Sequence, residues 1–596
     1  MSVQESMLHS VSFAQRRSEL ARLPVLVRCV LPAAHRAKAS GTAPFIAWLE
    51  GHARSRPQGL FCELDDEQVT FSEARHRARQ MASVLVAEGV RPGDVVALLG
   101  GNSPSYLLLI LAVGYAGAAA ALLNPELRGS PLAHALRSAA PRVSLVEHAH
   151  LAALSTLPEP ALAGKVLDFG TGQLERLAES APEIPKPLAD PQADFVLIFT
   201  SGTTGLPKSC RVRHERARSA ATIFGSVAFE FRSGDKLYCA LPLHHSSALL
   251  IGVGAALVAG VPIALRRKFS ARQFVPDLVR YGATATLYIG DVCRALLLTP
   301  PSLTERALRL RVAVGNGLEP ELWPAFQRRF GQPKIREFYA STEAPSAILN
   351  LTGKVGSVGH VPFERRRGFR LARLNSEQQD LARDASGRAS ECSADEPGEL
   401  LLRVFPSITE PHGAFGGYTD HGASAARVAR DVFELGDAYF RSGDVLRRDR
   451  EGYYYFVDRL GDTFRWKGEN ISALQVERVL SAELNFRGVA VFGVAVPGYP
   501  GRAGFAEIAV DPAMHDADFD ATRLAQAALA LPSHARPCFV RVVPALELTS
   551  SFKVKKRELE LAALAVSEVL WVRQESSYVV LTHKLWDDLC RGQARL

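Results

Sequence analysis

A glycine- and hydroxyl-rich segment directly follows an apolar run and could bind a polyphosphate. Residues 195–199 (FVLIF) lead into residues 200–208, with the sequence TSGTTGLPK. The glycines let the backbone turn and approach an anion closely, the hydroxyls supply donors, and the lysine adds a positive charge. The spacing differs from that of a Walker A loop. From these residues alone, a phosphate-binding loop and a polar surface turn both remain open.

Three other places carry charged residues that could take part in binding or catalysis. Glu343 follows two hydroxyl residues, Asp444 follows the strand-like segment YFRSG, and residues 553–556 include three lysines. Each place also has a structural interpretation: a carboxylate at a helix start, an ion pair of Asp444 with Arg459, and a solvated basic turn for the last lysines. The residue types alone do not separate these alternatives.

Two adjacent histidines, His244 and His245, precede the apolar run 248–254. On a strand their side chains would point to opposite faces and could not readily bind one metal ion, so a zinc site is not expected. Gly252 and Gly254 lack the rest of a dinucleotide-binding fingerprint and predict close helix packing instead.

The elements that must position these residues follow an α/β pattern. Apolar runs of four to six residues alternate with amphipathic stretches, which predicts largely parallel sheets with ligands at the carboxyl ends of the strands. Beyond residue 461 a smaller α+β pattern begins, and the proline-rich residues 182–191 are expected to form a surface linker between two half-sheets. Predicted strands lie at residues 237–241, 262–265, 285–289, 310–314, 334–338, 489–494, 505–510 and 539–543, and predicted helices at 271–281, 319–330, 474–484 and 522–531.

An uncharged stretch at residues 107–123 is just long enough to be considered as a membrane span. However, residues 95–99 resemble a strand, Asn102 or Ser103 can cap a helix beginning at Pro104, and residues 119–123 can form a second strand. We therefore expect a short buried helix followed by a buried strand, with membrane contact as the alternative.

Composition is that of an ordinary soluble protein. The chain has 596 residues, of which 47% are hydrophobic and 22% charged, and its net charge is +8. No segment alternates basic and aromatic residues, so nucleic acid is not an expected partner. The eight cysteines show neither close pairs nor metal-ligand spacing, and residues 1–20 lack an apolar signal region. These features predict a cytoplasmic protein, and peripheral attachment to a membrane remains open.

The order of the motifs carries a family resemblance. After TSGTTGLPK come YASTE at residues 339–343, YFRSGD at 439–444, Asp458-Arg459 and a lysine near the C-terminus. In this order they resemble the adenylate-forming superfamily of acyl-CoA synthetases, adenylation domains and luciferases. The segment DRLGDTFRWKGENIS, with GNGL, YIG and LPLHHS upstream, resembles the branch of fatty acid transport proteins and very-long-chain acyl-CoA synthetases.

The resemblance implies a domain organisation. It implies an N-terminal extension at residues 1–40, a large AMP-binding domain at 41–460 and a small mobile C-terminal domain at 461–596. The hinge would lie at residues 459–462, with Gly461 as the pivot.

The resemblance also implies roles for individual residues. Lys553 would bridge the acyl carboxylate and the α-phosphate, His245 would orient the carboxylate, and Glu343 would hold Mg²⁺. Trp466 and Gly468 would line the thiol side. The nucleotide would contact Thr200, Ser201, Gly202, Thr203, Thr204, Gly205, Lys208, Gly315, Asn316, Gly317, Tyr339, Ala340, Ser341, Thr342, Asp444 and Arg459. Thr200 is also a candidate for the catalytic set.

The implied activity is that of an ATP-dependent acyl-CoA synthetase using ATP, Mg²⁺ and coenzyme A. The acid is expected to be apolar, a long-chain or very-long-chain fatty acid, because residues 239–254 contain no Asp or Glu to pair with an amino group. Two alternatives remain: a fatty acyl-AMP ligase that passes the acyl group to a separate carrier protein, and a non-catalytic lipid-binding or transport component.

Overall fold

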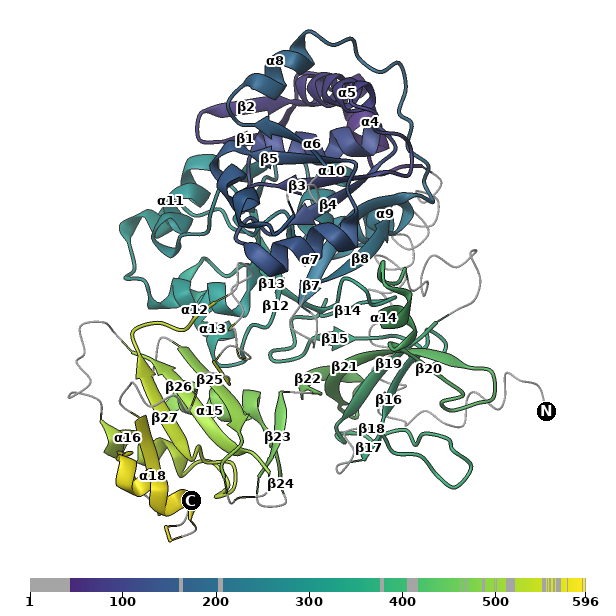
Figure 1. The fold of residues 1–596 in the computed structure, drawn as a ribbon. Helices are drawn as coiled ribbons and strands as arrows, with labels where there is room; N and C mark the ends of the chain where they lie inside the picture. Colours follow the sequence, from purple (N-terminus) through teal and green to yellow (C-terminus); the bar gives the residue numbers. More distant parts are fainter. Residues whose placement is uncertain are drawn as a thin grey trace. The chain divides into compact units, whose positions relative to one another are not determined.

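The computed structural model describes most of the chain. The described residues are 43–159, 164–201, 207–375, 380–404, 416–460, 462–466, 469–484, 488–497, 499, 501–510, 520–548, 554, 556, 559–560, 563, 570–575, 577–591, 593–594 and 596. The chain divides into two compact units, whose elements are labelled in Figure 1. The larger unit comprises Met1–Phe369, Leu402–Phe440 and Arg450–Tyr453, and the smaller one Arg370–Leu401, Arg441–Asp449 and Tyr454–Leu596.

A six-stranded sheet in the larger unit carries the first candidate loop. Its strands run in the order β6-β5-β3-β4-β7-β8. All neighbours are parallel except β7 and β8, which form an antiparallel hairpin. The bounds are β3 (Val95–Leu99), β4 (Ala119–Leu123), β5 (Val143–Glu147), β6 (Lys165–Phe169), β7 (Asp194–Ser201) and β8 (Pro207–Arg213).

A second sheet of the larger unit carries the other loops. Part of it runs in the order β15-β14-β13-β12-β11-β9-β10-β1-β2. The strands from β13 to β1 are parallel to one another, as the repeated strand–helix pattern predicts, whereas β14, β15 and β2 pair in antiparallel fashion. The bounds are β1 (Leu60–Leu64), β2 (Glu67–Thr70), β9 (Leu237–Cys239), β10 (Ile263–Leu265), β11 (Ala285–Ile289), β12 (Val312–Asn316), β13 (Lys334–Tyr339), β14 (Ile348–Leu349) and β15 (Gly359–His360).

Helices cover both sheets of the larger unit. Figure 1 shows α7 (Gly129–Ala139) lying across the six-stranded sheet, where its apolar side packs on β3 and β4. The other helices are α4 (Ala47–Ser55), α5 (Phe71–Ala87), α6 (Pro104–Tyr115), η2 (His148–Thr156), α8 (Gln173–Glu179), α9 (His214–Ile223), η4 (Phe224–Phe229), η5 (Ser247–Val253), α10 (Gly254–Ala259), α11 (Ala271–Tyr281), α12 (Gly290–Leu298), η6 (Leu303–Ala307), α13 (Leu322–Arg329) and α14 (His421–Ala425).

The uncharged stretch at residues 107–123 is a buried helix followed by a buried strand, as predicted. Ser103 caps α6 by accepting a hydrogen bond from the Tyr106 N–H at 3.0 Å, and Pro104 is the first helical residue. Every residue from 106 to 123 is buried, which explains why the stretch is apolar all round. Among the described residues, we find no helix long and apolar enough to cross a membrane.

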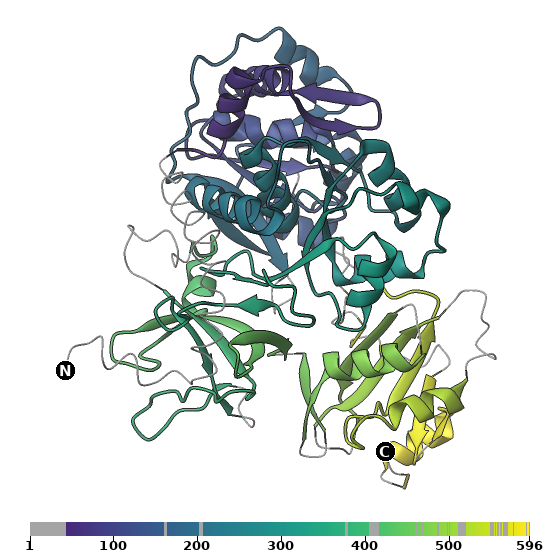
Figure 2. The same ribbon diagram turned by 180° about the vertical axis from the view of Figure 1, so that it is seen from behind.

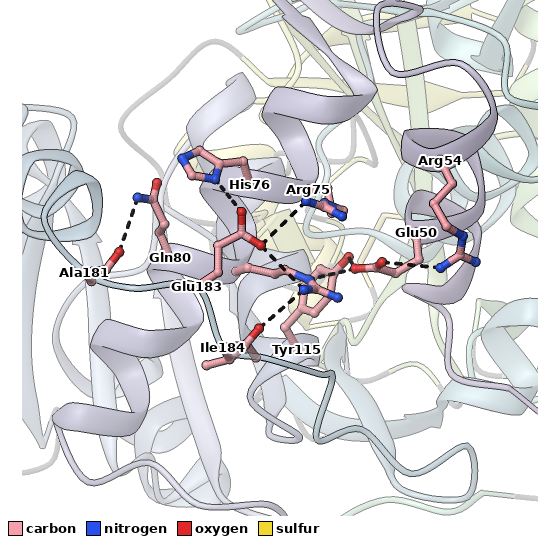
Figure 3. Close-up of polar contacts among 10 residues, drawn as sticks. Glu50, Arg54, Arg75, His76, Gln80, Tyr115, Ala181, Glu183 and Ile184 are labelled. Atoms are coloured by element: carbon pink, nitrogen blue, oxygen red, sulfur yellow. Dashed lines mark hydrogen bonds and ion pairs between the residues drawn. The ribbon is translucent and has the colours of Figure 1, made fainter.

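The proline-rich residues 182–191 do not join two half-sheets, and this prediction was wrong. The strand that follows, β7, pairs in parallel with β4 of the sheet that precedes the segment. The segment is instead held against α5 through Glu183 (Figure 3). The Oε1 of Glu183 lies 2.5 Å from Nδ1 of His76, and its Oε2 lies 3.5 Å from Nη1 of Arg79.

Arg79 extends this contact into a network of partly buried polar groups. Its Nε donates to Oε1 of Glu50 at 2.9 Å, and the same oxygen accepts the Tyr115 hydroxyl at 2.8 Å (Figure 3). The side chains of Arg79 and Glu50 are only 13% and 9% exposed. The network therefore connects α4, α5, α6 and the proline-rich segment around the ion pair of Arg79 and Glu50, which water screens poorly.

The smaller unit contains a five-stranded sheet in the order β25-β26-β27-β28-β29. Figure 2 shows α15 and α16 on one face of this sheet, and their apolar side chains share its core. The predicted helices and strands of this region are present within a few residues, and β28 and β29 extend the sheet. The bounds are β23 (Thr463–Trp466), β24 (Glu469–Ser472), α15 (Ala473–Leu484), β25 (Gly488–Val494), β26 (Ala503–Ala509), α16 (Ala521–Ala528), β27 (Phe539–Val543), β28 (Leu570–Gln574), β29 (Ser577–Val580) and α18 (His583–Cys590).

Shorter strands precede this sheet along the chain. Among them, β21 and β22 form an antiparallel ladder that carries Asp444 and Arg459. The bounds are β16 (Phe369–Ala372), β17 (Leu374–Asn375), β18 (Asp380–Leu381), β19 (Gly398–Arg403), β20 (Val428–Arg430), β21 (Ala438–Arg448) and β22 (Tyr453–Arg459).

The Arg79 network yields a stability prediction. Arg79→Met should lower the free energy of unfolding by about 2 to 4 kcal/mol, because it leaves the carboxylate of Glu50 buried without its main cation. Arg54→Met is the matched control: Arg54 also pairs with Glu50, but at 3.9 Å and with its side chain 71% exposed, so it should change stability by less than about 0.5 kcal/mol. Urea unfolding of both variants measures the difference. Equal losses of unfolding free energy in the two variants would contradict the role of Arg79 as the main cation beside Glu50.

Candidate active site

The β7–β8 hairpin brings the two ends of the glycine-rich segment together. Thr200 and Lys208 are direct partners in the antiparallel register, and Thr200 Oγ1 lies 3.5 Å from the carbonyl oxygen of Lys208. Gly202, Thr203, Thr204 and Gly205 lie outside the described residues, as does the side chain of Ser201.

A second segment runs alongside β8 and places a tyrosine beside Lys208. Cys210 and Tyr418 form an antiparallel bridge, and the Thr419 N–H donates to the Ser209 carbonyl at 3.0 Å. The ammonium of Lys208 lies 5.7 Å from the centre of the Tyr418 ring, within the range of a cation–π interaction. The hairpin and residues 416–419 therefore form one local structure.

Glu343 meets this structure from the loop after β13. Its side chain is buried at 9% exposure, and its Oε1 accepts a hydrogen bond from the Tyr418 hydroxyl at 3.0 Å. Burial raises the pKa of Tyr418, and the Glu343 carboxylate adds to this, so the hydroxyl stays a donor. No helix begins at Glu343, so the helix-start interpretation does not apply. Arg216 on α9 contacts the same loop, because its Nη2 donates to the carbonyl oxygens of Thr342 and Ala344, which flank Glu343. We call Lys208, Arg216, Glu343 and Tyr418 the Glu343 cluster.

The second carboxylate oxygen of Glu343 suits a cation. Oε2 is buried, and it has no hydrogen-bond partner among the described residues. Buried polar atoms normally have a partner, and a carboxylate oxygen is the ligand type that Mg²⁺ prefers. The residues present therefore fit the metal that the sequence predicted at this position.

The histidine pair lies close to the same loop. His244 and His245 occupy a turn between β9 and η5, not a strand, and their rings are 4.2 Å apart. The expectation that they point to opposite faces was therefore wrong. Burial lowers the pKa of His244 well below its ordinary value. The next residue, Ser246, exchanges a hydrogen bond of 2.9 Å with the Thr342 hydroxyl, which links this turn to the loop of Glu343.

Asn102 positions the approach to this turn. Its buried amide donates to the carbonyls of Leu241 and Arg266 at 2.9 and 3.0 Å, and its oxygen accepts the Leu243 N–H at 2.8 Å. These three bonds use most of the amide's hydrogen-bonding capacity. The residue that was expected only as a helix cap thus fixes the backbone immediately before His244.

The predicted adenine loop begins later than expected. β12 is Val312–Asn316, not residues 310–314, so Gly315 and Asn316 close the strand and the turn starts at Gly317 with a φ of +79°. A side chain at Gly315 would place its Cβ 2.2 Å from the Tyr288 carbonyl oxygen, so only glycine lets the two strands lie this close.

A buried carboxylate, Glu337 on β13, holds this turn. It accepts hydrogen bonds from the backbone N–H of Gly317, from the N–H of Leu318 at 3.2 Å and from the Tyr288 hydroxyl at 2.5 Å. Burial raises the pKa of Glu337 to about 8 in spite of these donors. Glu337 therefore ties the loop after β12 to both neighbouring strands.

The remaining residues of the YASTE motif line the same loop. Tyr339 is the last residue of β13 and is 8% exposed, whereas Ala340 is exposed. Ser341 Oγ accepts the Ala344 N–H at 3.2 Å, and this bond closes a tight turn around Thr342 and Glu343. The turn holds Glu343 at the carboxyl end of a parallel strand, where α/β proteins bind ligands.

The smaller unit carries the second group of predicted residues. Asp444 and Arg459 are partners in the β21–β22 ladder, and Oδ1 of Asp444 lies 3.3 Å from Nε of Arg459. Asp444 is buried, but the Arg459 side chain is 51% exposed. Glu399 supports the turn before Asp444, because its carboxylate accepts the Gly443 N–H and two guanidinium nitrogens of Arg441. The two candidates thus form the ion pair considered as the structural alternative, and a role in nucleotide binding stays a prediction.

The structure describes only some of the site residues that were predicted in the C-terminal part of the chain. Trp466 on β23 is 1% exposed and packs against Tyr499 in the core of the smaller unit. Gly461, Gly468 and Lys553 lie outside the described residues. Lys556 is not a solvated lysine as expected: its Nζ lies 2.7 Å from Glu477 Oε1, and its side chain is 22% exposed.

Sequence reasoning missed three residues of this region, namely Arg216, Glu337 and Tyr418. All three act through contacts with residues more than 15 positions away in the chain. Glu337 also lies just before the YASTE motif in the sequence. The available signals were weak: a glutamate within the strand sequence KIREFY, and a tyrosine after two glycines.

Comparison with known proteins gives the same assignment as the motifs. A profile of the family described as AMP-binding enzyme matches residues 49–403. Long-chain fatty acid transport protein 1 of Mus musculus is 37% identical over 607 residues, covering 97% of this chain and 92% of the relative. A medium/long-chain fatty acid–CoA ligase of Mycobacterium tuberculosis is 38% identical over 546 residues, covering 91% and 89%.

Solved structures share the fold. A benzoate CoA ligase from Burkholderia xenovorans has a TM-score of 0.71 at 21% identity, covering 87% of this chain and 100% of that one. An o-succinylbenzoate CoA synthetase from Bacillus subtilis has a TM-score of 0.69 at 23% identity, covering 87% and 98%.

The fold and the relatives define the class as an adenylate-forming acid–thiol ligase. The α/β architecture with a large body and a small C-terminal sheet is the one predicted from the sequence. The chain belongs to the AMP-binding enzyme family, and its relatives include the fatty acid transport proteins that the motifs indicated.

Glu337 yields a prediction on pH. Its pKa rises from 4.5 to about 8 on folding, so between these values the unfolded chain loses a proton that the folded chain keeps. Stability from this group should therefore fall by about 1.4 kcal/mol per pH unit across that window and level off above it. Glu337→Gln, which resembles the protonated acid, should lack this slope.

Urea unfolding of the wild type and of Glu337→Gln at pH 5, 6, 7 and 8 measures the effect. Glu321→Gln, which changes an exposed carboxylate at the start of α13, is the matched control and should follow the wild type. Parallel pH profiles for the wild type and Glu337→Gln would show that Glu337 is ionised in the folded protein.

Proposed function

We propose that this chain is an ATP-dependent acyl-CoA synthetase acting on an apolar acid, a long-chain or very-long-chain fatty acid. The observation that carries the proposal is the Glu343 cluster. A buried carboxylate has one oxygen held by Tyr418 and the other available to a cation, and Lys208 lies on the ring of the same tyrosine. This arrangement suits a magnesium–polyphosphate group at the end of the β7–β8 hairpin.

The reaction has two steps. A carboxylate oxygen of the acid attacks the α-phosphorus of ATP, and pyrophosphate leaves to give the acyl-adenylate. The sulfur of coenzyme A then attacks the acyl carbon, its proton is lost, and AMP leaves to give the thioester. Two anions must meet in the first step, so the site has to neutralise phosphate charge and orient the acid.

The residues of the larger unit can share these tasks. Lys208 and the loop after Thr200 would hold the β- and γ-phosphates, and Glu343 would hold Mg²⁺, which supplies positive charge to the phosphates. His245 would orient the carboxylate of the acid, and the loop from Gly315 to Gly317 would lie against adenine. The B. subtilis o-succinylbenzoate CoA synthetase has been solved with ATP and a magnesium ion, which supports this choice of ligands.

The surroundings of His245 support the proposal of an apolar acid. The helix η5 begins two residues later, and its residues 248–253 are all apolar and buried. A turn that presents His245 at the start of an apolar helix suits a carboxylate attached to a hydrocarbon chain. The names of the mouse transport protein and the mycobacterial ligase, which refer to long-chain and medium/long-chain fatty acids, support the same class.

The smaller unit would complete the site. Asp444 and Arg459 would bind ribose and phosphate, Trp466 and Gly468 would line the thiol side, and Lys553 would bridge carboxylate and α-phosphate. We propose that residues 461–596 rotate about a hinge at 459–462 between the two steps, because one set of residues is needed for adenylation and another for thiolation.

Removal of the metal-binding carboxylate tests the proposal. With a panel of fatty acids, ATP and Mg²⁺, the wild type should release pyrophosphate, and Glu343→Gln should lower the rate at least about 100-fold, because an amide lacks the negative charge that holds the cation. Glu321→Gln on the exposed start of α13 should retain the wild-type rate. If no acid releases pyrophosphate, a non-catalytic lipid-binding protein is the better description. If adenylate forms but coenzyme A does not accept the acyl group, a carrier protein is the acceptor.

Substitution of the C-terminal lysine separates the two steps. Lys553→Ala should abolish formation of the acyl-adenylate, while a supplied acyl-adenylate should still react with coenzyme A. Lys584→Ala, on an exposed position of α18, is the control and should leave both steps unchanged. Pyrophosphate release and the mass of the thioester report the two steps. Unchanged adenylation in Lys553→Ala would refute the role of this lysine.

A further inference from the structure

Two residues without an assigned role surround Glu343 from different parts of the chain. Arg216 is the third residue of α9, which follows β8 directly, and Tyr418 lies in the segment that runs alongside β8. The loop that carries Glu343 has little regular structure between β13 and β14. Its backbone carbonyls therefore need partners from elsewhere.

Arg216 supplies these partners on both sides of Glu343. Its Nη2 donates to the carbonyl oxygens of Thr342 and Ala344, each at 2.6 Å. Hydrogen bonds from a charged donor are roughly twice as strong as neutral ones. Because the two carbonyls flank Glu343, the guanidinium fixes the peptide groups that set the direction of its side chain.

Tyr418 fixes the side chain itself. Its hydroxyl donates to Oε1 of Glu343 at 3.0 Å, and among the described residues no group donates to Oε2. A carboxylate with one oxygen hydrogen-bonded rotates less than a free one, so its other oxygen keeps a fixed direction. Groups that orient a metal ligand in this way usually contribute about 10- to 100-fold to metal affinity or activity.

We infer that Arg216 and Tyr418 are positioning residues that hold the carboxylate of Glu343 toward the magnesium ion of bound MgATP. This inference rests on the proposed function. Arg216 acts on the backbone and Tyr418 on the carboxylate, and neither Arg216→Gln nor Tyr418→Phe removes Lys208 or the aromatic ring beside it. The expected defect is therefore in the use of Mg²⁺ and not in binding of the acid or of metal-free ATP.

The test measures ATP binding directly, by calorimetry on the full chain, in EDTA and over a series of MgCl₂ concentrations. In the wild type, Mg²⁺ should strengthen ATP binding. Arg216→Gln and Tyr418→Phe should each require about 10- to 100-fold more Mg²⁺ for half of that gain, with ATP affinity in EDTA unchanged. In pyrophosphate assays the same shift should appear in the Mg²⁺ dependence, with the KM for the fatty acid unchanged.

Arg211→Gln is the matched control. Arg211 lies on β8 five residues before Arg216, but its guanidinium pairs with Asp194 at 2.7 Å and is 42% exposed. This variant should need the wild-type concentration of Mg²⁺. A general weakening of β8 would instead shift all three variants together, which would overturn the inference.

The outcomes separate this inference from the proposed function. If the wild type shows the gain with Mg²⁺ and both variants match it, the inference is wrong and the function stands. If the wild type shows no gain at all, the metal site of the proposed function fails, and the inference with it. If Arg216→Gln does not fold, Tyr418→Phe, which removes one oxygen atom, decides: a wild-type response to Mg²⁺ refutes the positioning of Glu343.

Discussion

Burial of the Glu343 carboxylate is the constraint around which the larger unit is arranged. A charge taken out of water is costly unless other groups compensate it. Here the compensation comes from the Tyr418 hydroxyl, which donates to Oε1, and from the guanidinium of Arg216, which binds the flanking carbonyls. These groups come from distant positions in the chain, so the cluster can form only after β8, α9, the loop after β13 and residues 416–419 have packed together.

The sheets make this meeting possible. β12 and β13 are parallel neighbours, and their carboxyl ends therefore carry the Gly317 turn and the Glu343 loop to one edge. The turn after β9 is connected to the same loop by the bond between Ser246 and Thr342, and Asn102 fixes the backbone that leads into it. A regular framework thus places several irregular loops, which is the usual division between scaffold and site in α/β proteins.

Local patterns predicted the framework well. The helix cap at Ser103, the strand at Ala119–Leu123 and the helix Ala271–Tyr281 follow from neighbouring residues and agree with the structure. The family motifs pointed to Glu343 and Lys208, and both side chains contact Tyr418 in the structure, while their roles stay predictions. The predictions failed where distant contacts decide: the proline-rich segment returns to the same sheet, and Lys556 finds a buried partner in Glu477.

The same limit explains the residues that sequence reasoning missed. Arg216 is one of many arginines in the chain, and only the path of α9 brings it to the carbonyls of Thr342 and Ala344. Tyr418 carries no local signal for a bond to a glutamate 75 positions away. The two histidines were expected to point to opposite faces of a strand, whereas they lie in a turn that ends just before η5 begins at Ser247.

Two buried glutamates, Glu337 on β13 and Glu343 just after it, have different surroundings and are therefore suited to different roles. Glu337 is buried, its donors are all uncharged, and burial raises its pKa to about 8. It can therefore remain neutral at physiological pH and act as a rigid connection to the Gly317 turn. Glu343 lies six positions further on, where the guanidinium of Arg216 binds the carbonyls on both sides of it, and it keeps one oxygen without a donor among the described residues. The first carboxyl group thus suits the support of the Gly317 turn, and the second suits a metal ion, because only the second combines nearby positive charge with an oxygen left open.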